Sequence, residues 1–143
     1  MSNPYNLQRF VDAQENVFEN ALAELRAGSK QSHWMWFIFP QLAGLGRSAT
    51  ARHYAISSLG EARAFLAHSL LGPRLRKCVD RLLDWSGRRS AEQILGSIDS
   101  LKLRSSLTLF DLIEPNSSFA AALEAFFAGR RDDRTLALLN GGR

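Results

Sequence analysis

Apolar side chains recur at three- and four-residue steps along most of this chain, and no other feature constrains the fold as strongly. This spacing gathers apolar side chains on one face of an α-helix. The clearest example ends at Gly28, a residue type that commonly terminates helices, and its apolar positions are Leu7, Phe10, Val11, Val17, Phe18, Leu22 and Leu25. No segment alternates apolar and polar residues over a useful length, so we predict an all-α fold.

Capping residues and helix breakers divide the remainder of the chain into further helices. The side chains that can cap a first turn are Ser48, Ser58, Ser90, Asp99, Asn116 or Ser117, and Asp132 or Asp133. Pro73 suits a first helical turn, whereas Pro115 and Gly129 end helices. The helix expected between Asp99 and Pro115 is apolar on most sides, which is typical of a helix at the centre of a fold. We expect about seven helices in one compact domain spanning residues 1–143.

Composition limits the class of protein. Hydrophobic residues make up 45% of the chain and charged residues 22%, which is ordinary for a globular domain. The single cysteine, Cys78, shares an apolar helical stripe with Leu75 and Leu82, so we expect a buried thiol and no intrachain disulfide. The first thirty residues lack a signal-peptide pattern, and the apolar run at 34–40 is shorter than the roughly 20 residues of a membrane span. We expect a cytoplasmic protein that does not cross a membrane.

The charge balance is compatible with an anionic partner. The net charge is +4 and the pI is near 9.8, which suits a nucleotide or nucleic acid. The 18 basic residues are spread along the chain, so an ordinary solvated surface accounts for most of them. Two kinds of partner therefore stay open: a small anionic molecule in a pocket, or nucleic acid on a basic surface.

The segment from Gly28 to Tyr54 departs from the helical pattern, and such departures concentrate at functional or strained sites. We expect an irregular, largely buried segment with one short helical turn. Its aromatic cluster, with polar residues at both ends, comprises His33, Trp34, Trp36, Phe39 and Gln41. Such rings can stack on a base or sugar while the polar ends supply hydrogen bonds. Alternatively, the rings only form core, and His33 and Gln41 are satisfied buried polar groups.

A glycine-rich loop follows the aromatic cluster. It reads Gly44-Leu45-Gly46-Arg47-Ser48 and leads into the helix that Ser48 is expected to cap. Free backbone N–H groups at a helix start, together with Arg47, can hold a phosphate. No strand precedes the loop, and its spacing differs from the nucleotide-binding fingerprints. An ordinary turn followed by a helix cap is the alternative.

Four polar residues of the N-terminal third are further candidates. Lys30 and His33 follow the first helix and can bind an anion, and His33 can also transfer a proton. Asp12 and Gln14 lie beside the apolar stripe of that helix, where they can face a pocket under the aromatic segment. A solvated helix face is the alternative for both.

The expected central helix carries a second polar group. Lys102, Ser105 and Ser106 stand among leucines, three and four residues apart, and we place them on one face. A lysine on such a helix needs a partner, an exit to water or an anionic ligand. The scattered cysteine and three histidines lack metal-ligand spacing, so we predict neither a metal nor a cofactor.

Several of these motifs together resemble a bacterial family of unknown function, domain family 1810, whose members often carry the label calpastatin. The resemblance rests on SHWMWFIFPQ followed by GLGRS and extends from LQRFVDAQ through SAEQILGSIDSLKLRSSLTLF. The residues of the family pattern present here are Asp12, Gln14, His33, Trp34, Trp36, Phe39, Gln41, Gly44, Gly46, Ser48, Tyr54 and Lys102. The resemblance implies a single all-α domain and no established activity. Nothing in the chain is similar to the extended repeats of a protease inhibitor.

A looser resemblance points to the NADAR family of small helical proteins that act on ADP-ribose and related ribosyl compounds. It lies in an aromatic segment with Phe39-Pro40, then His53-Tyr54, then Glu61-Ala62. This resemblance implies a phosphorylated ribosyl ligand, in agreement with an aromatic and glycine-lined pocket.

Our main hypothesis is therefore a pocket protein for a nucleotide-like or phosphorylated sugar ligand, with hydrolysis of an ADP-ribose derivative as its enzymatic form. Trp34, Trp36 and Phe39 would stack on the ligand, and His33 or Asp12 would transfer the proton. The other expected ligand contacts are Gln14, Lys30, Gln41, Gly44, Gly46, Arg47, Ser48, Tyr54, Lys102, Ser105 and Ser106. The alternatives are a nucleic-acid or protein-interaction module, and a purely structural role for the aromatic segment.

Overall fold

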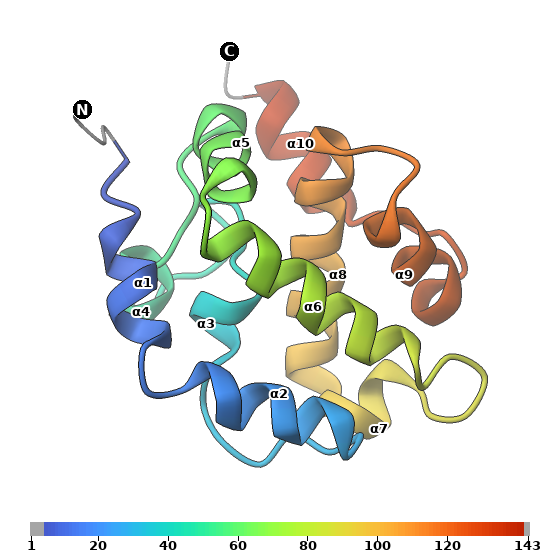
Figure 1. Cartoon of the computed structure of the whole chain (residues 1–143). Helices are drawn as coiled ribbons and strands as arrows, with labels where there is room; N and C mark the ends of the chain where they lie inside the picture. The colour runs from blue at the N-terminus through green and yellow to red at the C-terminus, as the bar shows by residue number, and fades with distance from the viewer. Residues whose placement is uncertain (1–4, 142–143) are drawn as a thin grey trace.

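A computed structural model describes residues 5–141 and shows a bundle of helices (Figure 1). The helices are α1 (Gln8–Gln14), α2 (Phe18–Arg26), α3 (Met35–Ile38), α4 (Ala49–His53), α5 (Leu59–Ala67), α6 (Leu71–Leu83), α7 (Ala91–Leu95), α8 (Ser97–Ile113), α9 (Ser118–Phe127) and α10 (Asp133–Gly141). The all-α class is confirmed, but these ten helices of the described range exceed the seven or so expected. That range contains no strand, only an isolated parallel bridge between Leu42 and Ile56.

The first predicted helix is two helices in the structure. α1 ends at Gln14, and a turn at residues 15–17 redirects the chain into α2. Phe10 of α1 packs edge-on against Phe65 of α5, whereas α2 lies along α6 (Figure 1). One straight helix could not reach both partners, so tertiary contacts override the continuous periodicity.

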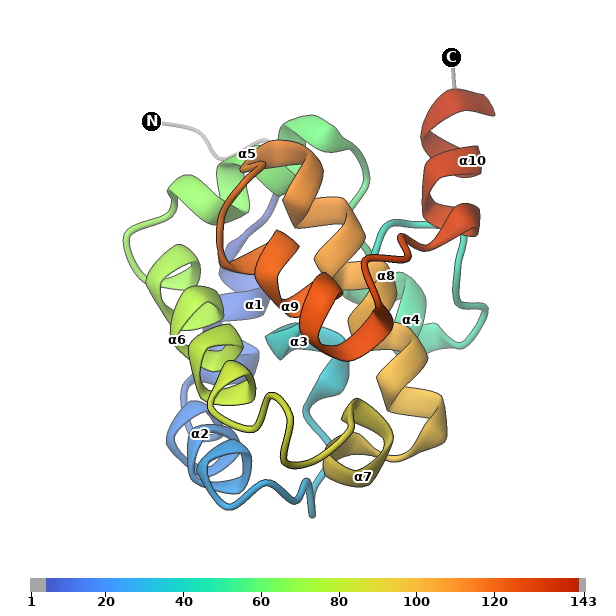
Figure 2. The same ribbon diagram turned by 90° about the vertical axis from the view of Figure 1, so that its right-hand side faces the viewer.

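α8 runs through the middle of the molecule and contacts α5, α7, α9 and α10 (Figure 2). Buried aromatic rings join it to its neighbours: Phe110 lies 5.5 Å from Phe65 of α5 and 5.8 Å from Phe119 of α9, between ring centroids. Cys78 of α6 is buried as predicted, and this burial raises the pKa of its thiol to about 12. The apolar stripes of the helices therefore meet in one core.

The expectation that the central helix is enclosed on most sides is wrong for its first turns. Ile98 and Leu101 are 70% and 60% exposed. The helix also begins earlier than expected, at Ser97, so Asp99 lies in its first turn and does not cap it. Gly96, with a φ of +92°, makes the turn from α7 into α8 in a backbone region that glycine adopts readily.

Most of the predicted caps are present. The hydroxyl groups of Ser48, Ser58 and Ser90 each accept a hydrogen bond from a backbone N–H in the first turn of α4, α5 and α7. Asp132 does the same for α10, through the N–H of Thr135 at 3.1 Å. These contacts span only three residues, which is why sequence spacing predicts them well. Within residues 5–141, no helix combines the length and apolar character that crossing a membrane requires.

Candidate ligand-binding groove

A carboxylate on α2 shapes the segment that leads to α3. Glu24 accepts hydrogen bonds of 2.6–3.1 Å from the backbone N–H groups of Gln31 and Ser32, the hydroxyl of Ser32 and the indole Nε1 of Trp34. Burial by itself raises the pKa of Glu24, but these bonds outweigh it and lower the pKa to about 2. The ionised carboxylate thus folds the chain back and directs Trp34 into the core.

Three of the predicted ligand contacts are core residues. Trp34 and Phe39 are fully buried. Gln14 is buried as well, and its amide is used internally: Nε2 donates to the carbonyl of Phe37 at 2.8 Å, and Oε1 accepts from Arg74 at 3.3 Å. Because none of the three offers an accessible surface to a ligand, we leave them out of the proposed site.

Trp36, by contrast, is partly exposed. The Nζ of Lys102 lies 3.7 Å from the centroid of its indole ring, a close cation–π contact. The same Nζ lies 3.3 Å from Oδ1 of Asp99, and Oδ2 of Asp99 pairs with Lys30 at 2.9 Å. One carboxylate therefore serves two ammonium groups, which leaves a positive charge in excess beside Trp36.

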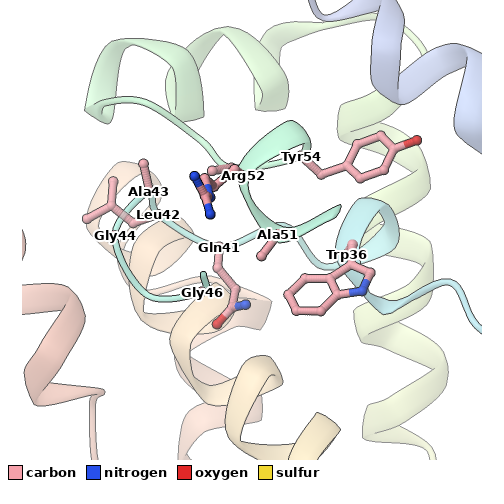
Figure 3. Close-up of a pocket in the computed structure, with 10 residues that line it drawn as sticks. Trp36, Gln41, Leu42, Ala43, Gly44, Gly46, Ala51, Arg52 and Tyr54 are labelled. Atoms are coloured by element: carbon pink, nitrogen blue, oxygen red, sulfur yellow. The ribbon is translucent and has the colours of Figure 1, made fainter. Parts of the chain in front are cut away.

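The loop after α3 is held in place by its bridge to Ile56. The carbonyl of Gln41 accepts a hydrogen bond from the Ile56 N–H at 2.8 Å. Gly46 lies close against α4, because a Cβ at this position would stand 2.5 Å from the Cβ of Ala51. Figure 3 shows the Gln41 side chain and the Trp36 ring extending toward the same space beside Gly46.

These elements surround a surface depression of about 290 Å³, which we call the Trp36 groove. Its lining residues are Trp36, Gln41, Leu45, Gly46, Ile98, Leu101, Lys102, Arg104, Ser105, Asp132 and Arg134. A smaller hollow of about 90 Å³ adjoins it, shares Trp36, Gln41 and Gly46, and reaches Arg52 and Tyr54 (Figure 3). The groove is close to the lower limit of about 300 Å³ for typical small-molecule pockets.

Positive charge predominates in the groove. Lys102, Arg104 and Arg134 face one acid, Asp132, so the lining carries three positive charges and one negative. The guanidinium of Arg104 lies 3.8 Å from Oδ1 of Asp132, and Arg134 donates to the carbonyl of Leu45 at 3.1 Å. Neither arginine is enclosed in a short bidentate ion pair, so both can still pair with an anion.

Asp132 is tied to α8 and α10. Its Oδ2 accepts hydrogen bonds from the hydroxyls of Ser105 (2.9 Å) and Thr135 (2.6 Å), and its N–H donates to the hydroxyl of Thr108 (2.9 Å). Burial by itself raises the pKa of Asp132, but these hydrogen bonds and nearby Arg104 hold it below its ordinary value. The carboxylate is therefore ionised at neutral pH. Across the part of the chain that the structure describes, no group of three or more His, Cys, Asp or Glu side chains could hold a metal ion.

The structure gathers some of the predicted site residues and separates others. Those that line the groove or its adjoining hollow are Trp36, Gln41, Gly44, Gly46, Tyr54, Lys102 and Ser105. The predicted proton-transfer residues, His33 and Asp12, are exposed and line neither, and Asp12 accepts a hydrogen bond from Gln8 at 2.9 Å. Ser106, four residues after Lys102, lines neither the groove nor the hollow. Its side chain is buried, because it points about 100° away from that of Ser105, toward the core.

The predicted phosphate loop is used internally. The Ser48 hydroxyl accepts from the Ala51 N–H at 3.0 Å, and the Arg47 carbonyl accepts two hydrogen bonds from the Arg52 guanidinium, at 3.0 and 2.7 Å. The side chain of Arg47 is exposed and does not line the groove. These contacts match the alternative of an ordinary turn and helix cap, and only Gly44 and Gly46 of the loop border the hollow.

Sequence reasoning did not single out several residues of the groove. Ile98 and Leu101 were missed, although they share one helical face with the predicted Lys102 and Ser105, so their spacing made this stripe of α8 detectable. The contribution of Arg134 had no local signal, because α10 is remote in sequence from α3 and from the loop after it.

Comparisons with known proteins agree with this architecture of a single helical domain. The chain belongs to the family described as "Protein of unknown function (DUF1810)", whose model matches residues 4–139. It is similar to the conserved hypothetical protein Rv1873 from Mycobacterium tuberculosis, known from a crystal structure, with 50% sequence identity and a TM-score of 0.93 over 96% of this chain and 99% of that one. Comparison with curated proteins found no match. These findings confirm the resemblance to family 1810 and do not show the resemblance to NADAR proteins.

Proposed function

We propose that the Trp36 groove binds a small anionic ligand, either nucleotide-like or a phosphorylated sugar. The observation that carries this proposal is the convergence of Lys102, Arg104 and Arg134 on one concave surface. Among the described residues, Asp132 is the only one that lines that surface with a carboxylate, and one of its oxygens is fully engaged by Ser105 and Thr135. An anionic group in the groove would gain charge-assisted hydrogen bonds without displacing a strong internal ion pair.

Trp36 and Gln41 suit the uncharged part of such a ligand. The Trp36 ring supplies an apolar wall, and no hydrogen bond of the Gln41 side-chain amide to another described residue is present. An amide of this kind can donate to and accept from ligand hydroxyl or carbonyl groups. The combination of apolar walls with a few convergent polar groups is typical of small-molecule sites.

Hydrolysis of an ADP-ribose derivative, the enzymatic form of this proposal, needs a proton-transfer group in the groove. His33 and Asp12 do not line the groove, so Asp132 is the carboxylate available there. Its lowered pKa keeps it ionised, which suits a base better than an acid. If the groove hydrolyses an N-glycosidic bond, Asp132→Asn should abolish turnover while ligand binding persists.

Isothermal titration calorimetry can test binding with AMP, ADP-ribose, ribose 5-phosphate and inorganic phosphate. We expect binding by at least one organic phosphate, and a loss of affinity of about tenfold or more in Lys102→Ala and in Arg134→Ala, because each removes a charge-assisted contact. Lys77→Ala is the matched control, since Lys77 is an exposed lysine of α6 outside the groove. Absence of binding by all four compounds, or equal affinity in all variants, would contradict the proposal.

A nucleic-acid interface is the second candidate, and the aromatic residues bear on it. An interaction module of this class is expected to present exposed aromatic rings surrounded by arginine. In residues 5–141 the most exposed large apolar side chains are aliphatic, and Trp36 lies in a concave surface. This arrangement favours the small-ligand proposal. Salt-dependent binding of single-stranded DNA that competes with none of the small phosphates would favour the alternative.

A further inference from the structure

One end of the Trp36 groove carries exposed aliphatic side chains that the fold does not use. Ile98 is 70% exposed and Leu101 is 60% exposed. No other large apolar side chain of residues 5–141 is as exposed as these two. Both line the groove, and Leu45 of the loop lines it as well. A ligand that covers exposed apolar surface at a concave site lowers the free energy of the complex, because that surface is removed from water.

These side chains lie in line with the charged end of the groove. Ile98, Leu101, Lys102 and Ser105 are spaced by three and four residues on α8, so they form one stripe. Along this stripe the surface changes from apolar at Ile98 and Leu101 to cationic at Lys102. A ligand lying along it must therefore combine an apolar group with an anionic group.

The dimensions of the apolar part favour a ring system. Ile98 and Leu101 are three residues apart, which corresponds to about 4.5 Å along the helix axis at 1.5 Å per residue. A surface of this length matches one planar ring system. Lys102 lies against the Trp36 ring at 3.7 Å, so a base stacking on that face would have to displace the ammonium group.

We propose that the ligand is a nucleoside phosphate whose base lies on Ile98 and Leu101 and whose phosphate faces Arg104 and Arg134. This inference rests on the proposed function of the groove and narrows it from phosphorylated sugars to nucleotides. It also places the base on the aliphatic surface of α8, whereas the sequence alone predicted stacking on the aromatic rings of the segment from Gly28 to Tyr54. Lys102 lies between the two ends, where it can reach the ribose or the phosphate.

The test compares ligands that share a phosphate and differ in the attached group. AMP, ribose 5-phosphate and hexyl phosphate are titrated calorimetrically into the wild-type protein and into Leu101→Ser, whose substitution is at an exposed position. We expect the wild-type protein to bind AMP at least about tenfold more tightly than ribose 5-phosphate. Leu101→Ser should remove most of this difference and leave the affinity for ribose 5-phosphate unchanged.

Leu112→Ser is the matched control, because Leu112 is 41% exposed on the same helix and lines no part of the groove. It should alter neither affinity, and circular dichroism should show native helix content in both variants. Equal binding of AMP and ribose 5-phosphate, both weakened by Lys102→Ala, would overturn the base position while preserving the anion site. Tighter binding of hexyl phosphate than of AMP would assign the surface to an alkyl group and overturn the inference. No binding of any phosphate would refute the proposed function itself.

Discussion

Replacing Glu24 by Gln removes the charge that holds the segment between α2 and α3. The carboxylate accepts four hydrogen bonds from Gln31, Ser32 and Trp34, and a fifth from Asn20 at 2.9 Å. A glutamine of the same shape keeps one acceptor oxygen and places an amide donor opposite groups that also donate. We therefore expect Glu24→Gln to lower the free energy of unfolding and to loosen this segment.

The pKa of Glu24 limits the size of this effect. A difference of one pKa unit between folded and unfolded protein corresponds to about 1.4 kcal/mol, so a pKa lowered from 4.5 to about 2 sets an upper limit of about 3 kcal/mol at neutral pH. Glu24 is partly exposed, and solvent screening reduces such contributions. We expect a loss of about 1–2 kcal/mol at pH 7.

The effect must also depend on pH in a defined direction. Because the folded-state pKa of Glu24 is the lower one, its contribution to stability is complete above the unfolded-state value of 4.5 and disappears as the pH falls toward 2. The difference in unfolding free energy between the wild-type protein and Glu24→Gln should therefore be constant from pH 7 to about pH 5. It should shrink below pH 4.5.

Urea unfolding followed by tryptophan fluorescence, at several pH values from 7 down to 3, measures this difference. Glu19→Gln is the control, because Glu19 is an exposed carboxylate on the same helix, and we expect a change within about 0.5 kcal/mol at every pH. A difference below about 0.5 kcal/mol for Glu24→Gln at pH 7, or one that does not decrease between pH 5 and 3, would refute this account of the segment.

Two further predictions concern the contact between α5 and α6 and the single thiol. Gly72→Ala should destabilise the protein by about 2 kcal/mol or more, because a Cβ there would overlap the backbone carbonyl of Leu66. Gly87→Ala is the control, because a Cβ there meets no atom within 4 Å and the substitution measures the cost of a positive φ alone. If urea unfolding shows a larger loss of unfolding free energy for Gly87→Ala than for Gly72→Ala, the steric argument is contradicted. Cys78 should not react with a thiol reagent such as DTNB at pH 8 until the protein unfolds, because burial raises its pKa to about 12. Rapid labelling of the native protein would show that the thiol is accessible.

Local signals in the sequence predicted the helical class and many helix boundaries. The caps at Ser48, Ser58 and Ser90 involve groups three residues apart, so their geometry follows from the sequence spacing. The apolar stripe containing Cys78 likewise predicted burial of this residue, because the apolar face of an amphipathic helix packs against the core. Such interactions depend little on the rest of the fold.

Local patterns do not distinguish the buried from the exposed aromatic residues in the segment from Gly28 to Tyr54. Trp34 and Trp36 are equally apolar, yet one is fully buried and the other partly exposed. The difference arises because Glu24, on another helix, binds the indole N–H of Trp34, whereas Lys102 of α8 covers Trp36. Both partners lie outside the segment, and Lys102 is remote from it in sequence. No pattern within the segment therefore indicates which ring is buried.

The sequence by itself determined an all-helical domain and placed Trp36, Gln41 and Lys102 among its candidate residues. Only the tertiary structure decided that these three meet, and that Arg104 and Arg134 complete the groove. The Arg134 guanidinium and the Leu45 carbonyl are 89 residues apart in sequence. They meet only because α10 packs beside α8. Helix formation is governed by neighbours within one or two turns, whereas the shape and charge of a groove are set by how separate helices pack.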